Sequence, residues 1–259
     1  MLKGLAGKAA LVTGGAGGIG QAVCRRLSDE GCRVVVADLD EAACKEVADT
    51  LPGEALGVAA DITTEEGARR AVGAAVDSFG RLDLLDINAG VECIARPIAE
   101  FDVADYRRVF DVNVLGAFLT AQAGVRAMTA DGLGGKILVT ASIAGLMGSV
   151  GTAVYNSSKH AVHGMARCLA LEVADAGIRV NTLMPGVVDT RMMRSLEDSM
   201  GAIAGLTGEQ FKEAMAAGVP LKRYARPDEI AATAAWILSD EVPYCHGEAF
   251  TVGGGIAPY

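Results

Sequence analysis

Tyr155 and Lys159 are the side chains of this sequence whose spacing best suits chemistry. If the segment is helical, residues four apart lie on one face, so the two side chains meet. A free phenol has a pKa of about 10 and is a poor base at neutral pH, but a nearby ammonium group favours the phenolate. The pair therefore predicts a phenol poised to exchange a proton, although the same spacing also fits two unrelated side chains on a solvated helix.

A glycine-rich run, Thr13-Gly14-Gly15-Ala16-Gly17-Gly18-Ile19-Gly20, follows a short apolar segment and opens a helix-forming one. In that context glycines allow a tight turn whose backbone N–H groups bind a pyrophosphate, so we expect a dinucleotide site. The run satisfies two spacings, Gly15-x-Gly17-x-x-Gly20 and Gly14-x-x-x-Gly18-x-Gly20, and the pattern alone does not choose between them. The cofactor-binding residues expected here are Gly14, Gly17, Gly18, Ile19 and Gly20.

Asp38 ends the next apolar run, where a carboxylate can accept hydrogen bonds from the adenosine ribose hydroxyls. Such a carboxylate repels a 2′-phosphate, and Leu39 beside it supplies no positive charge, so NAD is expected in preference to NADP. The alternative is that Asp38 caps the helix that follows it. Asp61 and Ile62 end the third run, and Asp61 is expected either to bind the adenine edge or to cap a helix at Thr63.

Short apolar runs alternate with helix-forming stretches along most of the chain. We expect strands at residues 9–12, 33–37, 55–60, 82–87, 136–140 and 179–183, and helices at 20–30, 40–50, 64–79, 103–128 and 152–176. Continuously apolar runs fit strands buried on both faces of a parallel sheet. The sequence therefore predicts an α/β fold, a single domain over residues 1–259 with a Rossmann-type, doubly wound parallel sheet and helices on both faces. A segment rich in Met and Gly, at about residues 190–225, breaks this rhythm and is expected to form a helical lid over the site.

The composition argues against several classes of function. The net charge of -9, from 23 Lys and Arg against 32 Asp and Glu, opposes binding to a phosphate backbone, so no nucleic-acid partner is expected. No apolar run suits a membrane span or a signal peptide, so we expect a cytoplasmic location and no membrane partner. The six cysteines are widely spaced without a C-x-x-C pair and are interpreted as reduced. His160 and His163 have no third ligand at a useful spacing, so no metal is expected.

Six motifs, in this order, resemble the short-chain dehydrogenase/reductase family: Thr13-Gly14-x-x-x-Gly18-Ile19-Gly20, Asn88-Ala89-Gly90, Asn113, Ser142, Tyr155-x-x-x-Lys159 and Pro185-Gly186. They span nearly the whole chain, which is identified as a member from their order and spacing. Two positions depart from the family pattern. Ile87 replaces the first asparagine of the usual Asn-Asn-Ala-Gly, with little chemical consequence expected. Gly253 replaces a common aspartate, which puts a local turn contact and a subunit contact in doubt.

The resemblance implies roles for the catalytic residues Ser142, Tyr155, Lys159 and Asn113. In the family the serine hydrogen-bonds the substrate oxygen, the tyrosine exchanges the proton, the lysine also holds the nicotinamide ribose, and the asparagine anchors a water in the proton relay. Without the resemblance, Ser142 would be interpreted as a hydroxyl that satisfies a turn and Asn113 as an amide that bonds locally. The resemblance also implies a homotetramer, and cofactor contacts from Asn88, Ala89, Gly90, Tyr155, Lys159, Pro185, Gly186, Val188 and Thr190.

The substrate-binding residues expected by family position are Cys93, Ile94, Met147, Val150, Met192 and Met193, which are all apolar or weakly polar. Such a lining suits a hydrophobic ketone or secondary alcohol, because a sugar would need several polar groups to replace its hydration. Residues 189–196 are similar to the lid start of family members that act on cyclic alcohols. The expected function is NAD-dependent interconversion of an apolar secondary alcohol, cyclic ones included, and its ketone.

Two other functions stay open. A reductase of 3-oxoacyl thioesters on acyl carrier protein fits the same catalytic set. Its acidic carrier would require basic residues gathered near the site, from Arg126, Arg191, Arg194, Lys222 and Arg223. A protein that binds NAD without turnover is the third reading, and the presence of Ser142, Tyr155 and Lys159 together argues against it.

Overall fold

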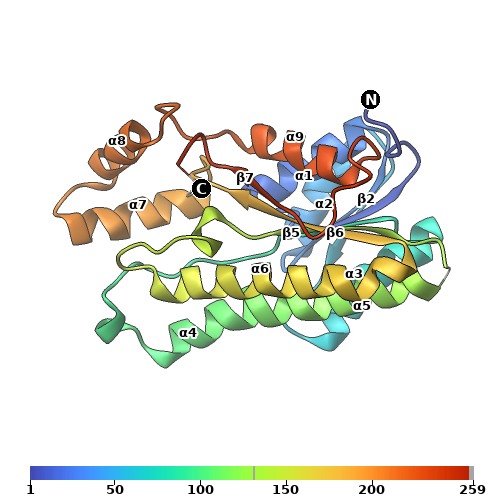
Figure 1. Ribbon diagram of the computed structural model, residues 1–259, viewed down its shortest axis with the longest axis horizontal. Helices are drawn as coiled ribbons and strands as arrows, with labels where there is room; N and C mark the ends of the chain where they lie inside the picture. Colours follow the sequence, from blue (N-terminus) through green and yellow to red (C-terminus); the bar gives the residue numbers. More distant parts are fainter. Residues whose placement is uncertain (131, 257–259) are drawn as a thin grey trace.

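In the computed structural model, which describes residues 1–130 and 132–256, seven strands form one parallel sheet in the order β3-β2-β1-β4-β5-β6-β7 (Figure 1). The strands are β1 (Ala9–Thr13), β2 (Arg33–Asp38), β3 (Ala55–Ala59), β4 (Leu84–Ile87), β5 (Gly135–Thr140), β6 (Ile178–Pro185) and β7 (Ala249–Val252). The strand order reverses between the neighbours β1 and β4, the place where ligands bind in open α/β sheets. The predicted fold class is confirmed. Residues 257–259 of the predicted domain lie outside the described residues.

Helices cover both faces of this sheet (Figure 1). The side chains of α1 (Gly18–Asp29), α2 (Glu41–Thr50) and α9 (Pro227–Leu238) join one hydrophobic cluster, and those of α3 (Glu65–Phe79), α5 (Ala117–Ala130) and α6 (Ala153–Val173) join another. Four of the five predicted helices begin and end within a few residues of the predicted positions. The predicted helix 103–128 instead divides into α4 (Val103–Phe110), a π-helical segment η2 (Asp111–Gly116) and α5, and α9 is not predicted.

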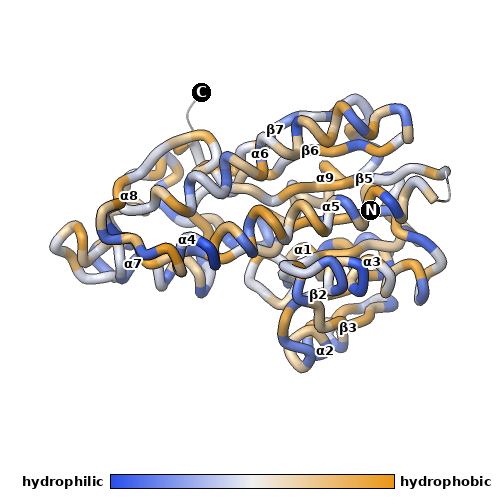
Figure 2. Tube along the Cα trace, turned by 90° about the horizontal axis from the view of Figure 1, so that it is seen from below, coloured by the Kyte–Doolittle hydropathy of each residue, from blue (hydrophilic) through white to orange (hydrophobic). Residues whose placement is uncertain are grey.

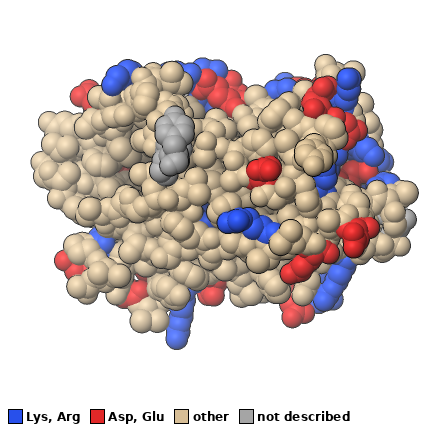
Figure 3. All heavy atoms as spheres, in the orientation of Figure 1, with Lys and Arg blue, Asp and Glu red and all other residues tan. Residues whose placement is uncertain are grey.

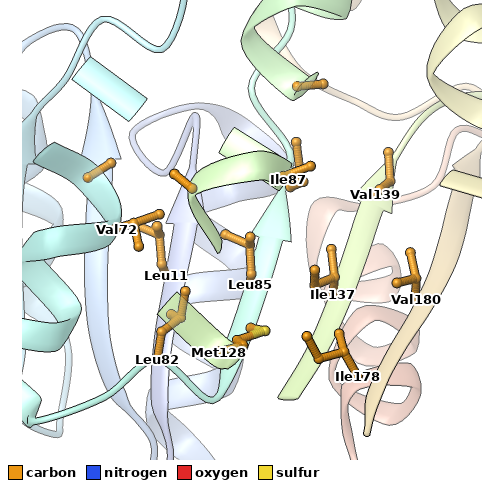
Figure 4. Close-up of a cluster of buried hydrophobic side chains, with 14 of the residues drawn as sticks. Leu11, Val72, Leu82, Leu85, Ile87, Met128, Ile137, Val139, Ile178 and Val180 are labelled. Atoms are coloured by element: carbon orange, nitrogen blue, oxygen red, sulfur yellow. The ribbon is translucent and has the colours of Figure 1, made fainter. Parts of the chain in front are cut away.

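The strands β1, β2, β4, β5 and β6 are mostly buried on both faces, as the apolar runs predict, whereas β3 is half-buried along its length. Successive side chains of a strand point to opposite faces, so Leu11 of β1 joins the cluster with α3 and α5, while Val12 joins the cluster with α1. In Figure 2 the strands, drawn mostly in orange, lie between helices whose turns alternate between orange and blue. Figure 4 shows the first cluster, in which Leu85 of β4 and Ile137 of β5 lie beside Met128 of α5. Packing of this kind fixes the strand ends that carry the site.

The sequence does not predict β7. This strand is short and lies at the sheet edge beyond β6, and its residues alternate between exposed and half-buried. A four-residue edge strand lacks the continuous apolar run that marks a strand covered on both faces.

Two helices, α7 (Arg191–Ala204) and α8 (Gly208–Gly218), extend beyond the carboxyl ends of the strands, at the left of Figure 1. Thr190 caps α7, and its Oγ1 accepts a hydrogen bond from the Met193 N–H at 3.2 Å. A capping box of Thr207 and Gln210 begins α8. The segment 191–224 is therefore helical, as expected, and short 3-10 turns lie at η1 (Ile98–Glu100), η3 (Ile143–Gly145) and η4 (Ala174–Ala176).

Acidic and basic side chains are interspersed on the face shown in Figure 3. In residues 1–130 and 132–256, no helix is long and apolar enough to cross a membrane. Within the same residues the six cysteines are all free, and Cys24, Cys32, Cys44 and Cys93 are buried.

Candidate active site

The glycine turn lies at the carboxyl end of β1, at the reversal of strand order. Gly14 has a φ of 64°, which favours glycine, and a Cβ there would lie 2.7 Å from the Ala89 Cα. A Cβ on Gly20 would overlap the Gly14 carbonyl oxygen. Gly17 is the N-cap of α1, and no described side chain caps that first turn. The turn thus leaves the helix N-terminus open to an anion, which fits a pyrophosphate.

The Asn88-Ala89-Gly90 turn after β4 is fastened to the glycine turn. The Asn88 and Ala89 N–H groups donate to Thr13 Oγ1 at 3.1 and 3.3 Å. The Asn88 amide donates to the carbonyl oxygens of Thr13 and Gly14 at 3.0 and 3.2 Å. The carboxyl ends of the two central strands are therefore one connected unit. Ile87, just before this turn, is buried in the core, so its departure from the family pattern changes packing rather than chemistry.

Asp38 lies beside the glycine turn rather than at a helix end. Its Oδ2 accepts from the Ala16 N–H at 3.1 Å and its Oδ1 from the Leu39 N–H at 2.8 Å. The capping alternative is wrong, because Asp40 caps α2 by accepting from the Ala42 and Ala43 N–H groups. Leu39 is 68% exposed, so its side chain is free of the core.

Asp61 organises the turn that leads into α3. Its Oδ1 accepts hydrogen bonds from the Thr63 N–H at 3.0 Å and the Thr63 hydroxyl at 2.6 Å. The N-cap of α3 is Thr64, so the alternative in which Asp61 caps a helix at Thr63 is wrong. The Ile62 side chain is buried, and a Cβ on Gly116 would lie 2.7 Å from its Cδ1. Only the main chain of Ile62 is thus available to a ligand.

Ser142, Tyr155 and Lys159 come together from β5 and α6. The Ser142 side chain is close enough to the Tyr155 hydroxyl to lower the pKa of that phenol. Lys159 Nζ lies 5.6 Å from the centre of the Tyr155 ring. A Cβ on Gly90 would lie 3.2 Å from the same nitrogen, so the lysine faces the Asn88-Ala89-Gly90 turn. The spacing of four residues therefore brings the two side chains together as predicted.

Ser142 also bonds locally. It is the N-cap of η3, and its Oγ accepts from the Ala144 N–H at 3.1 Å. The same Oγ lies 3.5 Å from the Pro185 carbonyl oxygen. The interpretation of Ser142 as a hydroxyl that satisfies a turn is thus correct for one hydrogen bond, the one that its Oγ accepts from the Ala144 N–H. The contact with Tyr155 shows that it is not the whole role.

Burial acts on the two titratable groups in opposite directions. It raises the pKa of Tyr155 to about 12, against the Ser142 hydrogen bond that lowers it, and the charges of Glu92 and Cys93 raise it further. Burial lowers the pKa of Lys159 to about 8. The sequence predicts a Tyr155 pKa lowered by Lys159. The structure gives the opposite direction, because the shift comes from burial, Ser142, Glu92 and Cys93 and not from Lys159. Among the described residues, one hydrogen bond, to the Thr140 carbonyl at 3.4 Å, is made by the Lys159 ammonium, which leaves donors for ribose hydroxyls.

Asn113 lies in the π-helical segment η2, 2% exposed. Its Oδ1 accepts from the Val91 N–H at 2.8 Å, and its Nδ2 donates to the Val91 carbonyl at 2.9 Å and to Ser158 Oγ at 3.0 Å. A buried amide requires hydrogen-bond partners, and Asn113 finds them in the loop after β4 rather than in the helix that carries it. π-helical turns in α-helices often occur at functional sites, where they re-aim a side chain.

The loop after β6 lies against the glycine turn. A Cβ on Gly18 would lie 3.0 Å from Thr190 Cγ2, which places Thr190 at the N-terminus of α1. Val188 is buried and pairs with Ala225. A Cβ on Gly186 would lie 2.8 Å from the Gly253 Cα, so the missing family aspartate is replaced by close packing of two glycines.

The predicted substrate residues divide by exposure. Cys93 and Met193 are buried, while Ile94 and Val150 are 58% and 74% exposed. Met147 and Met192 lie between these extremes, and the Met147 carbonyl accepts a hydrogen bond from the Asn156 amide at 2.8 Å. The structure thus places Ile94, Val150 and Met192 at the surface, and Cys93 in the small cluster that Tyr155 joins.

Sequence reasoning missed one group near Tyr155, the carboxyl of Glu92. Its pKa is raised to about 7 by burial, against a hydrogen bond with Ser195 of α7 and the charge of Arg108, which lower it. A glutamate two residues after a glycine turn looks like an ordinary solvated charge in the sequence, so no signal marked it.

No metal site joins this arrangement in residues 1–130 and 132–256, where no group of three or more His, Cys, Asp or Glu side chains could hold a metal ion. His160 Nδ1 lies 2.9 Å from the Asn156 carbonyl oxygen, and His163 Nδ1 lies 3.4 Å from Thr182 Oγ1. The two histidines therefore bond to separate neighbours.

Residues 8–201 match the family described as short chain dehydrogenase. Glucose 1-dehydrogenase 2 of Bacillus subtilis is 33% identical over 263 residues, covering 100% of this chain and 98% of its own. The 2,5-dichloro-2,5-cyclohexadiene-1,4-diol dehydrogenase of Sphingobium indicum is 36% identical over 251 residues, 97% of each chain. Cyclohexanol dehydrogenase of an Acinetobacter species is 35% identical over 250 residues, 95% of this chain and 94% of its own.

Solved structures also resemble this chain in both fold and sequence. NAD+-bound xylitol dehydrogenase superposes with a TM-score of 0.93 at 31% identity, covering 98% of this chain and 100% of the other. A variant of actinorhodin polyketide ketoreductase with NADPH gives 0.93 at 33% identity, covering 97% and 98%. The 3-ketoacyl-(acyl-carrier-protein) reductase of Brucella melitensis with NADH gives 0.88 at 30% identity, covering 98% and 100%.

Proposed function

Because the chain belongs to the short-chain dehydrogenase family, we propose that it is an NAD-dependent oxidoreductase that interconverts an apolar secondary alcohol, cyclic ones included, and its ketone. The observation that carries the proposal is the meeting of Ser142, Tyr155 and Lys159 beside the Asn88-Ala89-Gly90 turn. A phenol, a hydroxyl and an ammonium within reach of one another are what hydride transfer from an alcohol requires of a protein.

In the oxidative direction the alcohol loses a hydride from carbon and a proton from oxygen. The oxidised nicotinamide, when bound, supplies the hydride acceptor and a positive charge. Ser142 holds the substrate oxygen, and Tyr155 takes its proton. Positive charge near the phenol lowers its pKa, so the Tyr155 pKa of about 12 in this structure falls toward the working range in that state. Lys159 binds the ribose and adds to that charge.

The preference for NAD rests on Asp38. Its carboxylate lies at the end of β2 beside the glycine turn, where ribose hydroxyls donate and a 2′-phosphate is repelled. Leu39 next to it brings no compensating charge. The similar structures named above carry NAD+, NADH and NADPH, so this preference is argued from Asp38 and not from likeness.

An apolar substrate is supported by the exposed Ile94, Val150 and Met192, and by relatives named for cyclohexanol and for a chlorinated cyclohexadienediol. We assign the same six substrate residues as the sequence does, and a lid role to α7 and α8. The alternative, a 3-oxoacyl thioester reductase, is less well supported. Arg194 and Arg223, two of the basic residues that would dock an acidic carrier, are paired with Asp189 and Glu229.

A homotetramer is part of the proposal. Leu115, Phe118 and Leu171 are 41%, 48% and 84% exposed on η2, α5 and α6, which suits burial against other subunits. The cytoplasmic location stays a prediction.

The test is a spectrophotometric assay of the purified protein with NAD+ or NADP+ and a panel of alcohols that includes cyclohexanol, a linear secondary alcohol and glucose. We expect reduced nicotinamide to form with NAD+ and the cyclic alcohols. Failure to oxidise any alcohol or reduce any ketone with either cofactor would overturn the proposal.

A further inference from the structure

The helix α7 runs from the cofactor turn to the loop that leads into the catalytic helix α6. Before its first turn, Thr190 lies against Gly18 of the glycine turn, where an added Cβ would be 3.0 Å from Thr190 Cγ2. In its last turn, Ile203 lies against Gly151, where an added Cβ would be 2.9 Å from Ile203 Cδ1. Gly151 comes four residues before Tyr155 in the sequence. The two ends of α7 are therefore held on either side of the site.

A second contact joins the same helix to the loop after β4. The Ala95 N–H donates to Ser199 Oγ at 3.2 Å, and the Ser199 hydroxyl donates to the Leu196 carbonyl at 3.1 Å. Because its proton is directed to Leu196, the hydroxyl has a lone pair free to accept from Ala95. Ser199 and Ile203 are four residues apart and share one face of α7. That face therefore meets both the loop after β4 and the loop before α6.

We propose that Ser199 and Ile203 are positioning residues that fasten α7 across the site, so that substrate enters and product leaves only while their contacts are broken. The latch contacts are those of Ser199 with Ala95 and of Ile203 with Gly151. This role presupposes the proposed function, because it concerns access to that same site. It adds to the lid role of α7 and α8 the contacts that set how often the lid opens.

The two loops that meet α7 are fastened to each other and to the helix α4. The Arg96 N–H donates to the Gly151 carbonyl at 3.0 Å. Arg96 Nη2 lies 3.1 Å from Asp105 Oδ2 of α4, and its guanidinium carbon lies 5.7 Å from the centre of the Phe101 ring. Ala95, next to Arg96, is 5% exposed. The loops thus form a fixed surface against which α7 closes.

The helices α7 and α8 are held less firmly than the loops. Both extend beyond the sheet in Figure 1, and α8, all of which the structure describes, has no buried residue. Ser199 is half-buried and Ile203 is 41% exposed, so the face that carries the latch contacts lies at the surface. Elements with few buried contacts open at a lower free-energy cost than the core. We therefore expect α7 and α8 to open while the sheet stays folded.

Static packing of α7 and opening of α7 as a unit make different predictions. If the packing is static, Ile203→Ala weakens the contact with Gly151 and leaves the Ala95 N–H bonded to Ser199. If α7 opens as a unit, the same variant exposes the Ala95 N–H more often, although both partners of that hydrogen bond are unchanged. Hydrogen exchange at Ala95 therefore reports the opening of one latch contact after a change at the other.

The first measurement is hydrogen–deuterium exchange in the whole chain, resolved to the amides of Ala95 and Val91. Val91 is the internal reference, because its N–H donates to Asn113 Oδ1 and not to α7. Ile98→Ala, the same truncation at a side chain that is 76% exposed on η1, is the matched control. Ile203→Ala should speed exchange at Ala95 by about fivefold or more and leave Val91 within about twofold, the size of losing part of an apolar contact. Ile98→Ala should change neither.

The second measurement is steady-state turnover of an alcohol that the wild type oxidises, with Ser199→Ala and Ile203→Ala. Both variants should raise KM by about threefold or more while kcat stays equal or rises, because a lid that opens more often holds substrate less well and releases product sooner. A variant that only damages the site lowers kcat instead.

Unchanged exchange at Ala95 in Ile203→Ala, or an equal acceleration at Val91, overturns the latch and leaves the proposed function standing. A lower kcat with unchanged KM in both variants also overturns it. If the wild type turns over no alcohol and no ketone, the proposed function fails, and faster exchange at Ala95 in Ile203→Ala still supports the opening of α7 as a unit.

Discussion

Lys159 Nζ lies 5.6 Å from the centre of the Tyr155 ring, and burial moves the pKa values of the two side chains apart, to about 8 for Lys159 and about 12 for Tyr155. A buried phenol resists losing its proton, and a buried ammonium gives one up more readily. Neither shift helps stability at neutral pH. Variants of Tyr155 and Lys159 should therefore distinguish the effect of the pair on the stability of the fold from its effect on the rate of the reaction.

Tyr155→Phe should lower kcat by about a thousandfold or more. General acid–base catalysis by one positioned group accelerates a reaction by about 10²–10⁴-fold. The variant removes the hydroxyl that meets Ser142 and keeps the ring. NADH binding, followed by fluorescence of the nicotinamide, should persist. Full activity in Tyr155→Phe would refute the proton-exchange role.

Lys159→Met should be more stable than the wild type at pH 7 and much less active. Folding lowers the lysine pKa from 10.5 to about 8, so the cost of burying the charge is present in full below pH 8 and is relieved as the pH rises toward 10.5. Removing it should add about 2 kcal/mol, or roughly 5 °C in Tm.

Thermal melts at pH 7 and pH 10 measure this, and the gap between Lys159→Met and wild type should narrow at pH 10. A variant less stable than the wild type at pH 7 would show that the ammonium contributes net stability through the Thr140 carbonyl.

Asp38→Asn should weaken the preference for NAD over NADP by about tenfold or more, measured as the ratio of the two kcat/KM values. The amide keeps one oxygen for the Ala16 N–H, which lies 3.1 Å from Asp38 Oδ2, and loses the hydrogen bond from the Leu39 N–H. The charge that repels a 2′-phosphate is also lost. Asp40→Asn, at the N-cap of α2, is the control and should leave the ratio unchanged. An unchanged ratio in Asp38→Asn would remove the basis for the NAD proposal.

Asp86→Asn should stabilise the protein at pH 8. Asp86 is 1% exposed in β4; its Oδ1 accepts from the Thr140 hydroxyl at 3.0 Å, and its Oδ2 has no partner in the described part of the chain. Burial raises its pKa from 3.8 to about 7, so the folded state keeps a proton that the unfolded chain releases. Stability from this group therefore falls as the pH rises from about 4 to 7.

The expected gain at pH 8 is about 3 kcal/mol, or roughly 8 °C in Tm, and it should vanish near pH 4. Asp83→Asn is the control on the same segment. The Asp83 carboxylate is paired with Lys8 at 3.0 Å and accepts from the Ala9 N–H at 2.9 Å, so its loss should destabilise. Stabilisation by Asp86→Asn and destabilisation by Asp83→Asn at pH 8 would separate an unpaired buried carboxyl from a paired one.

The fold could be predicted from the sequence where one local rule decides the outcome. Six strands are predicted from continuous apolar runs; five of them are mostly buried between helices, and β3 is half-buried. The edge strand β7 is not marked by such a run, and its pairing with β6 depends on tertiary structure. The break at Asn113 is similar, because the amide bonds to Val91, which lies 22 residues away in the sequence.

The site could be predicted in position but not in electrostatics. The spacing of Tyr155 and Lys159 places them together, whereas the sign of the Tyr155 pKa shift depends on how far the fold buries it. The role of Asp38 likewise could not be decided from the sequence. A sequence cannot choose between Asp38 and Asp40 as the helix cap, since both are aspartates just after a strand. Three-dimensional neighbours decide each of these cases.

The segment that carries α7 and α8 begins after β6, and its two ends lie side by side at the bridge between Val188 and Ala225. The Asp189 N–H donates to the Ala225 carbonyl at 2.9 Å, and the Ala225 N–H donates to the Val187 carbonyl at 2.9 Å. Two hydrogen bonds thus join the residues just before α7 to the residue Ala225 that follows α8. A stretch anchored in this way can be transplanted whole from a relative without shifting the strands beneath it, so new specificities should be obtainable by exchanging one contiguous cassette.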